Sequence, residues 1–165
     1  TTTPRDMRSL ADAMPVVVSL CECVGSRLRR LGMRAGVLTL ELRSPELSWA
    51  SHRRRLSHHT DCDRELLCAA LGLLREAHEW PAPLRSLGVR AEELTPASAP
   101  EQLDMFVDRA DLERQRRLDA AVDRLRGRYG LDAVQRGPAG TGGILVRAKT
   151  GLTGEEERGI IMISF

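Results

Sequence analysis

The pentapeptide at positions 102–106 has the side chains of a docking peptide: one amide, one carboxylate and three large apolar groups. It consists of Gln102, Leu103, Asp104, Met105 and Phe106. The preceding residues 95–100 include two prolines, which remove backbone donors and disfavour helix, so we expect this stretch to be extended and accessible. An extended peptide of this kind is suited to a groove on another protein. The alternative is a staple that packs onto the domain's own core, but the polar flanking residues argue against it.

A second set of side chains could bind phosphate. Residues 26–90 carry 12 arginines against seven acidic residues, whereas residues 91–111 carry one arginine against six. Arginine suits phosphate because its planar guanidinium donates in a fixed fork. A basic body followed by an acidic connector indicates two surfaces with different partners.

Other potentially reactive residues form no recognisable site. The four cysteines fit neither a disulfide framework nor a paired zinc motif. We expect His58 and His59 to be surface imidazoles in a turn, and Trp49 and Trp80 to be core or rim residues rather than base-stacking platforms. The cysteines are Cys21, Cys23, Cys62 and Cys68.

Length and composition indicate one domain, or one domain with a tail, in 165 residues. The 42% hydrophobic content is sufficient for a core, and only 3% aromatic residues means that leucine, valine and alanine must fill it. No signal peptide or membrane-spanning run is recognisable, so we expect a bacterial cytoplasmic location and no membrane partner. The chain does not begin with methionine, and we expect it to be part of a longer protein.

Hydrophobic periodicity predicts the elements that position these side chains. Apolar residues from Leu10 to Leu31 alternate at spacings of three and four, which predicts a helix that starts near Pro15 and stops at Gly32. A second helix is expected from an N-cap at Thr60, and a third over 112–129. Alternating residues predict strands over 37–43, 52–58 and 84–94.

This order predicts an α+β fold. We expect an antiparallel sheet of about four strands with two helices on one face, followed by a C-terminal helix and a tail. The predicted parts are a domain over 1–95, a linker with the docking peptide over 96–108, a helical segment over 109–136 and a Gly-rich tail over 137–165. The apolar end at 160–165 has the composition of a strand, but its place is not predicted. The opposite, open face of the sheet would carry Thr39, Arg43, Arg53, Arg55 and Ser57.

Several stretches, in order, resemble the little finger, the C-terminal part of Y-family (translesion, polymerase IV-like) DNA polymerases. Residues 84–90, Leu-Arg-Ser-Leu-Gly-Val-Arg, are similar to the family's Arg-x-Ile/Leu-Gly-Val strand. Residues 1–6, 27–32 and 118–130 match further family positions, and residues 1–6 resemble the end of its first little-finger strand. The pentapeptide resembles the family's sliding-clamp motif, Gln-Leu-Ser/Asp-Leu-Phe, with Met105 in place of the second leucine.

The resemblance implies two partners, template–primer DNA and the beta sliding clamp of DNA polymerase III. The family's sheet grips DNA phosphates without sequence preference. By resemblance, Arg85 and Arg90 are phosphate contacts. Arg53 and Arg55 are added from this sequence, because the alternation along the predicted strand places both on its open face. The open-face residues Arg43 and Ser57 complete the predicted DNA-binding set. In the clamp, Gln102 would hydrogen-bond at the groove's edge while the apolar residues fill pockets.

The resemblance also implies chemistry that this chain lacks. Family members hold two metal ions with carboxylates of an Asp-x-Asp-like and a Ser-x-Asp-Glu-like element, and neither motif is present. We therefore expect no catalytic residue, metal site or cofactor here, with magnesium and nucleotidyl transfer belonging to a parent polymerase. Three alternatives remain open: a clamp-binding adaptor related to an inactive polymerase, a protein-interaction module whose arginines bind acidic protein surfaces, and a metal-binding regulator, which would need stoichiometric zinc.

Overall fold

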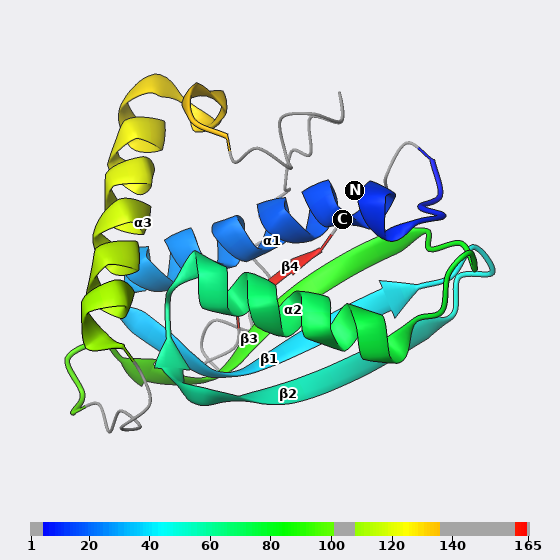
Figure 1. Ribbon diagram of the computed structural model, residues 1–165, viewed down its shortest axis with the longest axis horizontal. Helices are drawn as coiled ribbons and strands as arrows, with labels where there is room; N and C mark the ends of the chain where they lie inside the picture. The colour runs from blue at the N-terminus through cyan, green and yellow to red at the C-terminus, as the bar shows by residue number, and fades with distance from the viewer. Residues whose placement is uncertain (1–4, 101–107, 136–160, 165) are drawn as a thin grey trace.

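The computed structural model describes residues 5–100, 108–135 and 161–164, which form an antiparallel sheet with helices packed on one face (Figure 1). The elements in chain order are α1 (Leu10–Leu31), β1 (Met33–Arg43), β2 (Trp49–Thr60), α2 (Asp63–Ala77), β3 (Ser86–Pro96), α3 (Arg109–Tyr129), the 3₁₀ turn η1 (Leu131–Ala133) and β4 (Ile161–Ser164). The predicted α+β class is confirmed.

The strands lie in the order β2-β1-β3-β4, and each neighbouring pair is antiparallel. Helices α1 and α2 cover the same face, and α3 stands beside the end of α1 and the start of α2 (Figure 1). The opposite face is covered by no helix among the described elements. We call this surface, formed by the outward side chains of β1, β2 and β3, the open face.

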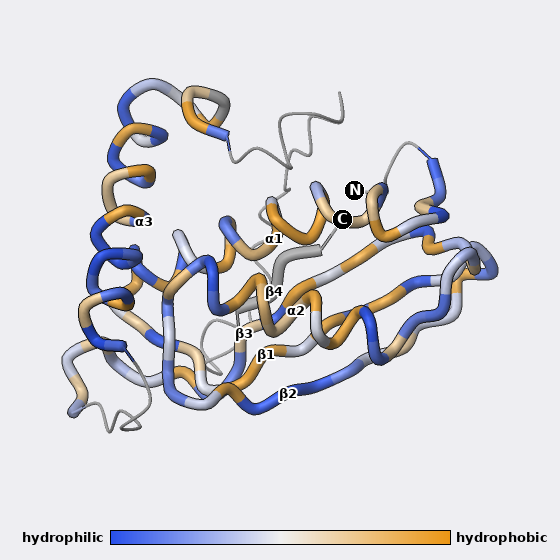
Figure 2. Tube along the Cα trace, viewed as in Figure 1, coloured by the Kyte–Doolittle hydropathy of each residue, from blue (hydrophilic) through white to orange (hydrophobic). Residues whose placement is uncertain are grey.

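Alternation along the strands separates the core from the open face. Leu38, Leu40, Val89 and Ala91 are completely buried beneath the helices, and the register pairs Leu40 with Val89. Figure 2 shows the consequence: apolar residues concentrate on the inner elements, whereas β2 at the sheet edge is largely hydrophilic. Within the described ranges, no helix is long and apolar enough to cross a membrane.

Helix α1 begins earlier than the sequence predicts. Ser9 caps it by accepting a hydrogen bond from the Asp12 N–H, and Pro15 lies inside the helix rather than at its start. A proline removes one i→i−4 hydrogen bond, but the cap and the burial of the helix's apolar side chains compensate for that loss. The predicted stop is confirmed, because Gly32 adopts φ 64° and its N–H donates to the Arg29 and Leu28 carbonyls.

The predicted Thr60 N-cap of the second helix is wrong. Thr60 ends β2, and Cys62 precedes the first helical residue without a side-chain cap. The Thr60 hydroxyl instead accepts from the Cys62 N–H and donates to Glu65, so it joins the strand to the helix. Side-chain bonds to a backbone two residues on are typical of such Ser/Thr turns.

The fourth strand comes from the C-terminal segment that the sequence analysis leaves unplaced. β4 runs antiparallel to β3, with Gly88 opposite Ser164 and Ala91 opposite Ile161. Residues 1–4, which resemble the end of a family strand, lie outside the described residues. Met7, just after them, forms a single bridge with Leu84.

Helix α3 is attached to the body by a buried ionic network. The Arg29 guanidinium of α1 lies 2.8 Å from Asp63 of α2 and 2.6 Å from Asp123 of α3. Asp119, only 1% exposed, accepts the Asp63 N–H at 3.0 Å. Burial alone would lower the pKa of the Arg29 guanidinium, but its hydrogen bonds to Asp123 and Asp63 outweigh burial and raise that pKa. The network fixes α3 against both other helices.

Candidate nucleic-acid interface

The open face brings the predicted arginines of β2 and β3 into one row. Thr39 of β1 lies opposite Arg53 on one side and Arg90 on the other, and Val37 lies opposite Arg55. The side chains of Arg53 and Arg55 are 58% and 78% exposed. Arg53 and Arg55 therefore lie on the face that the alternation along β2 predicts. We call Arg53, Arg55 and Arg90 the arginine row.

Acidic residues on the same face pair with this row. Arg53 lies 3.4 Å from Glu92 and 3.0 Å from Glu93, and Arg55 lies 2.7 Å from Glu93. Arg90 contacts Glu41 closely and lies 3.9 Å from Glu92. Arg53 and Arg55 are exposed, and exposed ion pairs contribute only about 0–1 kcal/mol each, so a phosphate can exchange for a carboxylate there at modest cost, whereas Arg90 is only 28% exposed.

A backbone irregularity lets two successive acids reach the arginine row. Glu93 has φ 52°, a conformation that non-glycine residues rarely adopt, so its side chain joins that of Glu92 on Arg53. Glu92 also accepts a 2.8 Å hydrogen bond from Thr39. The hydrogen bond from Arg55 holds the pKa of Glu93 below its usual range. The Glu93 carboxylate thus remains charged at neutral pH and holds the guanidinium groups of Arg53 and Arg55 in place.

Arg85 lies apart from the arginine row. It precedes β3, and its guanidinium lies 3.1 Å from the Asp6 carboxylate. The backbone N–H of Arg85 donates to the Arg43 carbonyl. This bond places Arg85 at the end of the sheet where the hairpin between β1 and β2 closes. The structure therefore separates Arg85 from Arg90, which the sequence analysis treats together.

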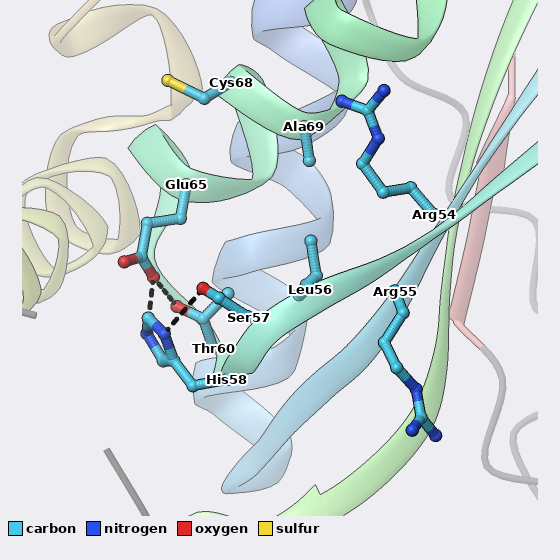
Figure 3. A pocket seen from close by; sticks show the side chains of 9 residues that line it. All are labelled: Arg54, Arg55, Leu56, Ser57, His58, Thr60, Glu65, Cys68 and Ala69. Carbon is cyan, nitrogen blue, oxygen red and sulfur yellow. Dashed lines mark hydrogen bonds and ion pairs between the residues drawn. The ribbon is translucent and has the colours of Figure 1, made fainter. Parts of the chain in front are cut away.

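Ser57 lies on β2 two residues beyond Arg55 and contacts a neighbouring histidine. Its hydroxyl lies 3.2 Å from Nδ1 of His58, at a shallow pocket between β2 and α2. Figure 3 shows His58 turned toward Glu65 and in contact with Ser57, while Arg55 points away. The expectation that His58 is a surface imidazole is wrong, because its side chain is 5% exposed and lies 3.3 Å from Glu65. A strand, not a turn, carries this histidine inward.

Trp49, which the sequence predicts to be a core or rim residue, lies at the rim of the sheet. It lies directly opposite Arg43, the last residue of β1, and is 55% exposed on the open face. The Arg43 guanidinium lies 5.2 Å from the indole centroid, within cation–π distance. Trp80, by contrast, packs against the core, as expected. Trp49 and Arg53 are four residues apart on β2, and residues an even number apart on a strand share a face. This spacing could have identified Trp49 as a residue of the open face.

The predicted clamp peptide, 102–106, lies outside the described residues. Its flanks are fixed on both sides. Before it, the Ala97 N–H donates to the Gly32 carbonyl at 2.7 Å. After it, Asp108 caps α3 by accepting from the Ala110 and Asp111 N–H groups. The structure thus describes the end of the sheet before the peptide and the capped start of α3 after it.

Comparisons with known proteins now bear on this geometry. The family profile described as the impB/mucB/samB family C-terminal domain matches residues 1–105. DNA polymerase IV of Moorella thermoacetica is 37% identical over 142 residues, covering 86% of this chain and 34% of that protein. DNA polymerase IV of Acetivibrio thermocellus is 32% identical over 138 residues, covering 82% and 34%.

A third relative, DNA polymerase IV of Pelotomaculum thermopropionicum, is 36% identical over 145 residues, covering 84% of this chain and 35% of that protein. The chain thus spans about a third of the length of these relatives. The order of matching stretches described above agrees with this result. The chain belongs to the impB/mucB/samB family, as a C-terminal domain of the Y-family polymerase type.

Proposed function

We propose that this chain is the DNA-binding and clamp-binding C-terminal part of a bacterial translesion DNA polymerase, acting in DNA damage tolerance. One observation carries the proposal. Among the elements that the structure describes, no helix covers the open face of this family's sheet, and that face presents the arginine row with two of its side chains more than half exposed. In this role the parent protein would act in the bacterial cytoplasm, and its magnesium-dependent reaction would belong to parts outside this chain.

The arginine row would bind the phosphates of template–primer duplex. Arg53 and Arg90 flank Thr39 across three adjacent strands, which are about 4.8 Å apart. Arg53 and Arg90 are thus two strand spacings, about 9.6 Å, apart, so their guanidinium groups can contact phosphates about three steps apart on one DNA strand, at about 3.4 Å of axial rise per step. Such contacts carry no base sequence information, so the binding would be general.

The acids of the open face would keep this binding weak. Glu41, Glu92 and Glu93 offset the charge of the three arginines, so little long-range attraction remains. A weak, general DNA contact benefits from a tether that raises its local concentration. The pentapeptide 102–106 would supply that tether by binding the sliding clamp.

The DNA contact is tested by fluorescence anisotropy with a short duplex at several salt concentrations. Replacing Arg53 and Arg90 by alanine should lower the affinity and reduce the salt slope by about 0.9 for each phosphate that is no longer neutralised. Arg117→Ala is the matched control, because Arg117 is 76% exposed on α3, away from the sheet. An unchanged slope in the double variant, or no duplex binding by the wild type at low salt, would refute the DNA contact.

The clamp contact is tested separately by pull-down with the purified beta clamp. Gln102→Ala and Phe106→Ala should each abolish capture while the circular dichroism spectrum stays unchanged, because the fold does not depend on a docking peptide. Leu131→Ala, which truncates a 74% exposed leucine, is the control and should bind like wild type. Normal capture of both pentapeptide variants would show that the clamp assignment is wrong.

A further inference from the structure

The Arg43–Trp49 pair differs from every other arginine contact on the open face. The arginine row is paired with carboxylates, whereas Arg43 has no ion-pair partner among the residues that the structure describes. Its guanidinium instead lies 5.2 Å from the centroid of the Trp49 ring. The pair therefore offers a cation that carries no neutralising acid, next to a large exposed aromatic face.

The hairpin that carries the pair is closed by hydrogen bonds. Ser44 and Leu47 donate backbone hydrogen bonds across the turn, to Ser48 and to Ser44 respectively, and the Ser44 and Ser48 hydroxyls lie 2.8 Å apart. Leu47 has φ 69°, which is uncommon outside glycine and is held by this surrounding network. The ring of Trp49 is thus presented by a pre-organised turn, not by a loose loop.

The turn beside the pair carries one exposed apolar side chain and one acid. Leu47 is 56% exposed in the same turn and extends the apolar surface around Trp49. The one acid of the turn, Glu46, hydrogen-bonds to Ser44, which holds the pKa of Glu46 below its usual range. The ligand that fits an open aromatic ring beside an uncompensated guanidinium has a flat face and a negative charge.

We propose that Arg43 and Trp49 form a contact for single-stranded DNA, in which one unpaired base stacks on Trp49 and an adjacent phosphate binds Arg43. The inference rests on the proposed DNA-binding function and extends it from duplex to single strand. Bases within a duplex are already stacked, whereas an unpaired base has a free face for an aromatic side chain.

The position on the sheet suits a strand that leaves the duplex. Trp49 precedes Arg53 by four residues on the same face of β2, which is about 13 Å at the rise of a strand. This distance corresponds to about four base steps at 3.4 Å. Duplex on the arginine row and an unpaired template segment on Trp49 could therefore be held together.

The test uses intrinsic fluorescence of the full chain carrying Trp80→Phe, which leaves Trp49 as the single indole. Addition of oligothymidine of about 12 nucleotides should quench Trp49, because a stacked base quenches an indole. Trp49→Ala should weaken oligothymidine binding by about 5- to 150-fold, the range for one stacked base, and duplex binding by less than about twofold. Trp49→Phe should retain most of the affinity.

Matched variants separate stacking from charge. Arg43→Gln should reduce the salt slope for oligothymidine by about 0.7, the value for one single-strand phosphate. Tyr129→Ala is the control, because Tyr129 is 63% exposed with Arg128 at 5.3 Å, a similar pair on α3 away from the sheet. Tyr129→Ala should leave both the oligothymidine affinity and its salt slope unchanged.

The outcomes distinguish this inference from the proposed function. If duplex binds with the salt dependence described above, but Trp49 is not quenched and Trp49→Ala binds oligothymidine normally, the single-strand contact is refuted alone. If neither duplex nor oligothymidine binds, the DNA-binding function and this inference both fail. A normal circular dichroism spectrum for Trp49→Ala excludes misfolding as the cause of any reduced binding.

Discussion

Removing one carboxylate from the open face should strengthen duplex binding. Glu92 is the best target, because its carboxylate contacts both Arg53, at 3.4 Å, and Arg90, at 3.9 Å. Glu92→Gln keeps an oxygen that can accept the Thr39 hydroxyl, so the local structure should persist. The change therefore isolates charge.

The expected gain follows from the geometry. A phosphate bound to Arg53 would lie roughly 6 Å from the Glu92 carboxylate, where two charges in water repel by about 0.7 kcal/mol. A second phosphate on Arg90 would double this to about 1.4 kcal/mol, a factor of about ten. Glu92→Gln should thus bind duplex about three- to tenfold more tightly at low salt.

Fluorescence anisotropy at two salt concentrations measures the effect, which should shrink as salt rises because the Debye length is about 8 Å at 0.15 M. Glu76→Gln is the matched control. It removes the same charge from a carboxylate that pairs with Arg54 on the helix side of the sheet. Equal duplex affinities for Glu92→Gln and Glu76→Gln would refute the reasoning. The gain would then come from the change in net charge alone, which does not depend on the face of the sheet that loses the carboxylate.

Three further predictions concern the body of the domain. Asp119→Ala should lower the unfolding free energy by about 3–5 kcal/mol, because it breaks a buried charge network and leaves the Asp63 N–H without its acceptor. Gly25→Ala should cost about 1–3 kcal/mol, because the added Cβ would lie 2.0 Å from the Asp63 carboxylate. Cys68, which is exposed, should be alkylated rapidly at pH 8, whereas Cys23 should be protected because burial raises its pKa to about 11.

Each of these has a simple control. Chemical denaturation measures the first two. Gly127→Ala, whose Cβ would meet open space within α3, should be neutral or stabilising, as alanine is the better helix former. A destabilisation below about 1 kcal/mol in Asp119→Ala would mean that the network does not hold α3. Mass spectrometry of alkylated peptides checks the cysteines, and equal labelling of Cys23 and Cys68 would contradict the burial argument.

The sequence predicts the sheet well because the apolar residues that alternate along each strand are the same residues that the sheet buries. Leu38 and Leu40 alternate with Thr39 and Glu41, and this period of two directly sets which side chains reach the open face. Helix starts are less predictable. Pro15 disfavours helix locally, but the Ser9 cap and buried neighbours override it, and no local pattern reports that balance.

The electrostatic character of the open face could not be read along the chain. Counting charges assigns Glu92 and Glu93 to an acidic connector, whereas both lie in β3 beside arginines nearly forty residues earlier. Only the register brings them together. Trp49 is a similar case, because its exposure follows from its place opposite Arg43 at the hairpin. β4 has no periodicity long enough to indicate its partner strand.

The most direct test of the central claim is a heteronuclear NMR titration that follows arginine side-chain Nε–Hε resonances while a short duplex is added. DNA bound on the open face should shift the resonances of Arg53, Arg55 and Arg90, and should leave that of Arg54 unchanged, because its guanidinium pairs with α2 on the other side. Shifts at Arg54 with an unperturbed arginine row would contradict the account, because DNA would then lie on the helical side of the domain.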